Sequence, residues 1–226
     1  MIALIAPSAV FLDLFRLEDQ VNFLNEEASF YHVDIMDNHF VRNMALSHTF
    51  VAQLRKKATI PIDAHLMVTE PYSLLDCLLE SGADYITPHI EAVNANVFTV
   101  IKKIKDGGAK AGIAVNPATS IDHLRYFLDR LDKITIMTID PGFAGQPFLE
   151  PMLKKIRELR MLKDEHGYKY LIEIDGQCNE KYYHLMEQAG AEVFVVGPSG
   201  LFGLDNDIRV AWQKMMAYMQ QKGEHV

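Results

Sequence analysis

The sequence has few cysteines, no excess of positive charge and no long apolar run, and each absence excludes a class of protein. Cys77 and Cys178 are the only two cysteines in 226 residues, too few for a disulfide framework, so we expect a reducing, cytoplasmic location. The formal net charge of −8 argues against nucleic acid or an anionic membrane as a partner. No apolar run approaches the roughly 20 residues that span a bilayer, and the apolar N-terminal segment lacks the basic residues of a signal peptide.

The sequence does contain a regular alternation of short apolar segments with amphipathic ones. The apolar segments are predicted to be parallel strands buried on both faces: 2–6, 30–35, 62–67, 85–87, 111–115, 134–138, 170–174 and 193–196. Apolar residues at helical spacing lie between them, as in the series Leu14, Leu17, Val21 and Leu24. With no linker or composition shift, this pattern predicts a single (β/α)8 TIM-barrel domain over residues 1–226. The alternative, an open doubly wound sheet, lacks its usual Gly-rich first turn.

Histidines and aspartates gather where the predicted strands end. His32 and Asp34 share one face of a strand because they are two residues apart, and Asp63 and His65 do the same on the next. The active site of a barrel lies at the C-terminal ends of its strands, where Asp175 also falls. Asp63 lies about 7 Å deeper and is expected to orient a ligand. We expect the others to hold one divalent cation: His32, Asp34, His65 and Asp175.

Two carboxylates in this cluster suggest a reaction. They would repel each other and raise one pKa, but a divalent cation between them removes that penalty. With a substrate carbonyl polarised by the cation, one carboxylate can remove the neighbouring proton and the other can return it to the opposite face. The predicted chemistry is therefore epimerisation.

Three Gly-rich turns follow the last three predicted strands, at residues 141–146, 176–177 and 197–200. Backbone amides in such turns bind phosphate in many barrels, although a turn between a strand and a helix often needs glycine anyway. His89 is expected to be a hydrogen-bonded histidine at a strand end. The methionines near strand ends are expected to fill the core, or alternatively to cover a reactive intermediate: Met36, Met67 and Met137.

Several motifs together resemble the ribulose-phosphate 3-epimerase family. They are His-Val-Asp-Ile-Met-Asp-Asn-His-Phe-Val (32–41), Asp-Ala-His-Leu-Met-Val (63–68), Val-Asn-Pro (115–117), Asp-Pro-Gly-Phe-Ala-Gly-Gln-Pro-Phe (140–148) and Glu-Ile-Asp-Gly (173–176). The resemblance runs over residues 8–212. It implies a TIM barrel of the ribulose-phosphate-binding type, a phosphorylated ketose as substrate, and a homo-oligomer.

The same resemblance assigns roles to residues. It makes Asp34 and Asp175 the proton acceptor and donor, and His32 and His65 their companions around one divalent ion (Zn, Mn, Co, Fe or Mg, with the identity open). It also implies a set of substrate contacts: Ser8, His65, Gly142, Phe143, Ala144, Gly145, Gly176, Gln177, Gly197 and Ser199.

Details of the motifs resemble the D-allulose-6-phosphate 3-epimerase branch, notably Asp140 and the segments 144–148, 175–179 and 196–202. We therefore expect interconversion of D-allulose 6-phosphate and D-fructose 6-phosphate, with D-ribulose 5-phosphate and D-xylulose 5-phosphate as the alternative pair. Three residues depart from the family pattern: Asn38, Arg42 and Pro198. Pro198 has no N–H to offer a phosphate, and Arg42 is expected to be solvated.

Two other functions are disfavoured by particular residues. Decarboxylases and aldol enzymes on similar barrels resemble this chain but carry a lysine in an Asp-x-Lys-x-x-Asp run, where this sequence has Met36 between Asp34 and Asp37. A non-catalytic sugar-phosphate sensor would have no need of both carboxylates, yet Asp34 and Asp175 are both present.

Overall fold

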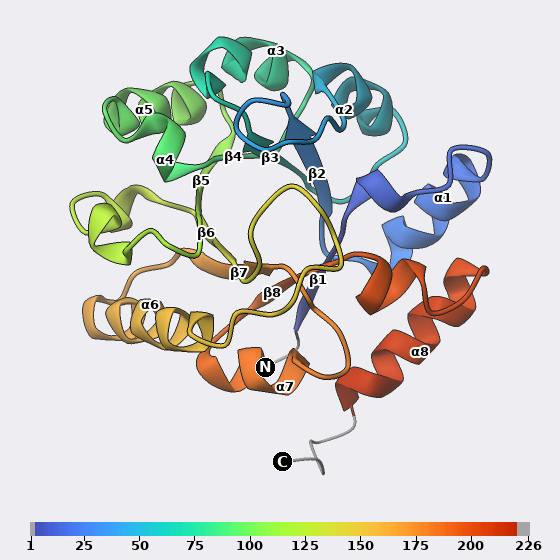
Figure 1. Ribbon diagram of the computed structural model, residues 1–226. Helices are drawn as coiled ribbons and strands as arrows, with labels where there is room; N and C mark the ends of the chain where they lie inside the picture. The colour runs from blue at the N-terminus through green and yellow to red at the C-terminus, as the bar shows by residue number, and fades with distance from the viewer. Residues whose placement is uncertain (1–2, 221–226) are drawn as a thin grey trace.

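The computed structural model describes residues 3–220 and contains an eight-stranded parallel barrel surrounded by helices (Figure 1). The strands pair in the order β1-β8-β7-β6-β5-β4-β3-β2, and a parallel bridge between Ser8 and His32 joins the two ends. The predicted (β/α)8 barrel is thus confirmed. The strands are β1 (Leu4–Pro7), β2 (Tyr31–Met36), β3 (Ile62–Met67), β4 (Tyr85–Pro88), β5 (Lys110–Val115), β6 (Lys133–Met137), β7 (Leu171–Asp175) and β8 (Val193–Val196).

Helices cover the outside of the barrel. They are α1 (Leu17–Glu27), α2 (His48–Arg55), α3 (Leu75–Glu80), α4 (Ile90–Val93), α5 (Val97–Asp106), α6 (Met152–His166), α7 (Tyr183–Ala189) and α8 (Ile208–Gln220). Between β5 and β6 the chain forms two 3₁₀ turns, Ile121–Leu124 and Leu128–Arg130, in place of an α-helix. Ser120 caps the first of them by accepting a hydrogen bond from the Asp122 amide. Each helix buries an apolar stripe against the strands, as Ile156 and Leu159 do in α6.

The start of α1 differs from the expectation. Leu14 was predicted to lie on its buried stripe, but the helix begins at Leu17 and Leu14 is 72% exposed. The Asp13 side chain accepts a hydrogen bond from the Phe15 amide at 2.9 Å, and this local turn holds the chain out of helical geometry. The prediction for Leu14 is wrong. The first strand, predicted from Ile2, is seen from Leu4, and Ile2 lies outside the described residues.

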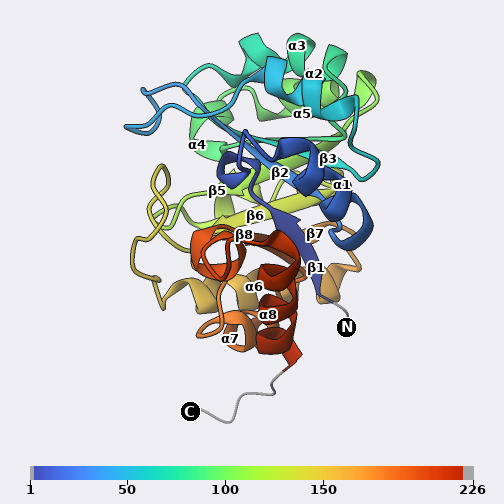
Figure 2. The ribbon, with the colours of Figure 1, turned by 90° about the vertical axis from the view of Figure 1, so that its right-hand side faces the viewer.

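The register of the strands brings the predicted site residues together. His32 of β2 lies opposite Asp63 of β3, Asp34 opposite His65, and Met36 opposite Met67. Because alternate side chains of a strand point into a barrel, these pairs form successive levels of its interior. Figure 2 shows that the loops after β2 and β6 extend from the same end of the barrel. No helix within residues 3–220 has the length and apolar character needed to cross a membrane.

Candidate active site and metal centre

Four side chains from three strands meet in the barrel interior near the C-terminal ends of the strands. Each of them can offer one nitrogen or oxygen, and these atoms lie within 4.8 Å of one another; the residues are His32, Asp34, His65 and Asp175. Nε2 of His32 lies 3.2 Å from Oδ1 of Asp34 and 3.7 Å from Oδ2 of Asp175. Nδ1 of His65 lies 3.2 and 3.5 Å from the same two oxygens. Ser8 donates a hydrogen bond to Asp34 at 2.6 Å.

The donors of this cluster suit a divalent cation. Two imidazole nitrogens and two carboxylate oxygens are a common ligand set for Zn²⁺ and related ions. Nε2 of His32 and Nδ1 of His65 are only 3.1 Å apart, and both histidines are wholly buried. Two nitrogens so close together, each beside a carboxylate, fit a shared cation that would order all four side chains.

Beneath the cluster lies a second level of buried charge. Oδ2 of Asp63 is 3.0 Å from Nδ1 of His32, but the two atoms do not form a hydrogen bond. Lys133 donates to Asp63 and, at 2.7 Å, to Glu173, and all three side chains are buried. The ammonium group supplies the positive charge that two buried carboxylates require. Asp63 therefore takes the supporting position against His32 that the sequence suggested.

His89 and Glu91 form a third feature, on the far side of His65. Nε2 of His65 lies 2.8 Å from Nε2 of His89, and Nδ1 of His89 lies 3.3 Å from Oε2 of Glu91. Burial lowers the pKa of His89 to about 4. Burial opposes ionisation of Glu91, but hydrogen bonds from His89, Thr119 and the Asn116 amide outweigh it and hold its pKa at about 2. His89 is thus a neutral link between an ionised carboxylate and His65.

The two carboxylates of the cluster have very different acidities. Burial opposes ionisation of Asp34, but the imidazoles of His32 and His65 outweigh it and hold the pKa of Asp34 well below its usual range. Burial, followed by the charge of Asp34, raises the pKa of Asp175 to about 6. Such a separation is typical of paired acids and bases in active sites.

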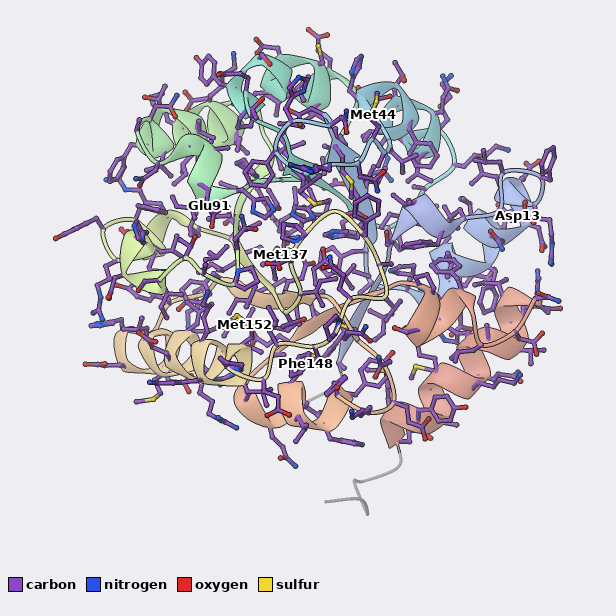
Figure 3. All side chains as sticks on the ribbon, viewed as in Figure 1. Asp13, Met44, Glu91, Met137, Phe148 and Met152 are labelled. Atoms are coloured by element: carbon purple, nitrogen blue, oxygen red, sulfur yellow. The ribbon has the colours of Figure 1, made fainter. Side chains whose placement is uncertain are left out.

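The cluster forms the floor of a pocket of about 430 Å³. Asp34 and Asp175 reach the pocket, while His32 and His65 lie beneath it and do not line it. His65 was expected to contact the substrate, but its side chain does not line the pocket. The other expected contacts all line the pocket: Ser8, Gly142, Phe143, Ala144, Gly145, Gly176, Gln177, Gly197 and Ser199. Met67 and Met137 are buried, as the expectation that methionines fill the core requires, and together with Met36 they also line the pocket, as the alternative requires; Figure 3 places Met137 at the barrel centre.

The loops around the mouth are tied to one another by side-chain amides. Asn43, on the loop after β2, donates to the carbonyl of Gly142 on the loop after β6 at 2.7 Å. Gln177 donates to the carbonyl of Gln146 at 2.5 Å, which joins the loops after β7 and β6. Gly176 has a φ of +118°, and a Cβ there would lie 2.8 Å from Ile139, so only glycine fits this turn.

The residues that depart from the family pattern occupy tolerant positions. Asn38 adopts a φ of +61°, a conformation that asparagine tolerates better than most residues. Arg42 is exposed and does not line the pocket, as expected. Pro198 is the first residue of a short helical turn, Pro198–Phe202. The first N–H group of a helix has no partner within the helix, so the turn loses no hydrogen bond by having proline there.

Some of these residues were not found by sequence reasoning. Lys133 stood just before the predicted strand 134–138, and Glu173 lay within the predicted strand 170–174; only their inward direction in the barrel reveals a buried ion pair. Glu91 lies on α4 at the rim of the barrel (Figure 3). Nothing in the sequence indicated a role for it except its place two residues after His89.

Comparison with known proteins identifies the family. The model of the "Ribulose-phosphate 3 epimerase family" matches residues 4–202. A ribulose-phosphate 3-epimerase from Aquifex aeolicus is 37% identical over 96% of both chains. The chain belongs to the ribulose-phosphate 3-epimerase family. Other members are the enzymes of Bacillus subtilis, 36% identical over 88% of this chain and 92% of that protein, and Serratia marcescens, 40% identical over 88% and 95%.

Membership of this epimerase family makes the protein an isomerase. Solved structures with similar folds include KGPDC from Streptococcus mutans, with a TM-score of 0.72 and 14% identity over 96% of this chain and 97% of that one. A 3-hexulose-6-phosphate synthase has a TM-score of 0.68 and 14% identity over 95% and 99%. At such low identity these two structures bear on the fold alone.

Proposed function

We propose that the protein interconverts D-ribulose 5-phosphate and D-xylulose 5-phosphate by moving a proton at C3, with Asp34 and Asp175 as the two bases. The observation that carries the proposal is the pair of carboxylates that both reach the floor of one pocket from separate strands, β2 and β7, with β1 and β8 between them. A substrate carbon held between them would have a base on each face.

The positions of the two carboxylates suit this chemistry. The imidazoles of His32 and His65 keep Asp34 ionised, so it can accept the C3 proton, and Asp175, which comes from a different strand, can donate a proton to the other face. Removal of the C3 proton leaves an enediolate, and donation from the opposite face gives the epimer. In the reverse direction the two groups exchange roles, as microscopic reversibility requires.

His32, Asp34, His65 and Asp175 would hold the divalent cation of this site. When bound, the cation would polarise the substrate ketone and stabilise the charge of the enediolate. Other side chains of the pocket support the reaction. The methionine side chains over the floor exclude water from the reacting carbon, and Ser8 holds Asp34 in position through its hydrogen bond.

We place the phosphate of the substrate against the loops after β6, β7 and β8. These loops line the part of the pocket formed by Gly142–Gly145, Gly176 and Gly197–Ser199, and in similar barrels amides of the last two loops bind phosphate. None of the residues that line this pocket is a lysine or arginine. We infer that backbone amides, with the Ser199 hydroxyl, take the phosphate charge.

The relatives support the pentulose phosphates better than the hexulose phosphates that the motifs favoured. Proteins 36–40% identical to this chain are named ribulose-phosphate 3-epimerases. Asp140, Ala144 and Pro198 are the observations that keep D-allulose 6-phosphate as the second candidate, because they resemble the hexulose branch. A pocket of about 430 Å³ lies within the range of roughly 300–1,000 Å³ typical of small-molecule sites and does not separate the two sugars.

Kinetics on both sugars would test the proposal. We expect a higher kcat/KM for D-ribulose 5-phosphate than for D-allulose 6-phosphate; the reverse order would assign the hexulose instead. In deuterated water, the wild-type enzyme should exchange the C3 hydrogen of its substrate. Asp175→Asn should lower the rate of epimerisation by roughly 10²–10⁴-fold, because it removes one acid–base group.

Asp129→Asn is the matched control, since Asp129 is exposed on the 3₁₀ turn Leu128–Arg130 outside the site. It should leave epimerisation and thermal unfolding unchanged. Epimerisation by Asp175→Asn at a near wild-type rate would contradict the two-base mechanism.

A further inference from the structure

The side chain of His65 presents one nitrogen to the candidate metal site and the other to His89. Nδ1 lies among the carboxylates of Asp34 and Asp175, whereas Nε2 lies 2.8 Å from Nε2 of His89. An imidazole nitrogen can take a cation only through a lone pair, so a neutral His65 must carry its hydrogen on Nε2. Some neighbouring group must keep the hydrogen there.

The contact between the two Nε2 atoms has room for a single hydrogen. One nitrogen must donate and the other must accept, and both rings are wholly buried. Nδ1 of His89 faces the carboxylate of Glu91 at 3.3 Å, which can only accept. A neutral His89 therefore carries its hydrogen on Nδ1 and offers the lone pair of Nε2 to His65. The ring of Phe40 packs against His89, with centroids 4.7 Å apart, and restricts its rotation.

We propose that Glu91 is a positioning residue that acts through His89 to place the hydrogen of His65 on Nε2, which leaves Nδ1 free to take a divalent cation. The inference rests on the proposed metal site and adds two residues to it. Glu91 itself is held firmly: its Oε1 accepts a hydrogen bond from the Asn116 amide at 2.9 Å, and its side chain is only 24% exposed. Carboxylate–histidine pairs behind a metal ligand commonly fix its tautomer and raise its affinity for the metal.

Glu91→Gln should reverse the hydrogens along the chain. The Asn116 amide would keep the carbonyl oxygen of the new side chain on its side, so that the NH₂ group faces Nδ1 of His89. His89 would then carry its hydrogen on Nε2, and two donors would meet at the contact with His65 once a cation occupied Nδ1. We expect the affinity for Zn²⁺ to fall about 10–100-fold.

The tautomer can be measured directly in the protein without added metal. Two-bond proton–nitrogen NMR spectra of the histidine rings should show His89 protonated at Nδ1 in the wild type and at Nε2 in Glu91→Gln. Glu80→Gln, which changes an exposed glutamate of α3, is the control and should change neither the tautomer nor the affinity for Zn²⁺. Thermal unfolding would verify that each variant is folded.

His89→Gln provides a second test. Its amide can turn its carbonyl to His65 whatever stands at position 91, so adding Glu91→Gln in this background should change the Zn²⁺ affinity by no more than about twofold. Protonation of His89 at Nε2 in the wild type would overturn the inference, even without a folded variant. The inference would also be overturned if Glu91→Gln bound Zn²⁺ as tightly as the wild-type protein does. A wild-type protein that binds no divalent cation would overturn the metal site and this inference with it, whereas the proposed function is tested separately by the kinetics on the two sugars.

Discussion

Replacement of Lys133 by methionine should destabilise the protein more than any comparable change at its surface. The ammonium group of Lys133 is wholly buried and contacts the carboxylates of both Asp63 and Glu173. Methionine has a similar length and no charge, so it fills the space but leaves two carboxylates together in the barrel. Removal of one partner from a buried ion pair costs about 3–5 kcal/mol, a large part of the roughly 5–15 kcal/mol that stabilises a typical domain.

Urea unfolding of Lys133→Met at about pH 7.5 would measure this loss. The matched control is Lys102→Met, because Lys102 also pairs with an aspartate, Asp106, but on the exposed face of α5. An exposed pair of this kind contributes at most about 1 kcal/mol. If each variant lost less than about 1 kcal/mol of its free energy of unfolding, the argument that Lys133 neutralises two desolvated carboxylates would be refuted.

The pH dependence gives an independent check. Without the ammonium, the folded state of Lys133→Met should raise the pKa of Asp63 or Glu173 above its unfolded value, because two buried carboxylates repel. A group with a raised pKa takes up a proton on folding, so the deficit of the variant should shrink as the pH falls from about 7.5 to about 5.5. The double variant Lys133→Met/Glu173→Gln, which removes one of the two charges, should lose less than the sum of the single variants. A deficit that grows on acidification would contradict this account.

Two further predictions concern the loops at the mouth of the pocket. Gly176→Ala should cost more stability than Gly167→Ala, by about 1–3 kcal/mol in thermal or urea unfolding, because both have positive φ but only at Gly176 would a Cβ meet neighbouring atoms; equal losses would contradict the steric argument. Asp37 accepts hydrogen bonds from the Thr69 and Phe40 amides; although burial opposes ionisation, these bonds lower its pKa to about 2. Its contribution to stability should therefore be complete above about pH 4 and be lost as the pH falls through about 2, so that the difference in stability between wild type and Asp37→Asn shrinks steadily over that range. A difference as large at pH 2 as at pH 5 would rule this out.

The sequence was a good guide to the barrel and to the side chains that gather in the candidate site, for a physical reason. Parallel strands buried on both faces read as apolar runs, and each of the eight predicted strands overlaps an observed one within a few residues. The i, i+2 spacing of His32 and Asp34 placed both on one face of β2. Leu14 was the exception, because the side chain of Asp13 competes for backbone hydrogen bonds in a way that periodicity does not reveal.

The partners of those residues were decided by the tertiary structure. Lys133, on β6, and Asp63, on β3, are 70 residues apart, and no local pattern predicts that a lysine at the start of an apolar strand points inward to neutralise a carboxylate. Glu91 likewise acquires its place only because β4 ends beside β3, so that His89 meets His65. The strands, the inward faces and the donor atoms of the candidate site follow from the pattern of residues along the chain. Closure of the barrel decided which buried charges face one another, because the cost of burying a charge depends on neighbours that come from distant strands.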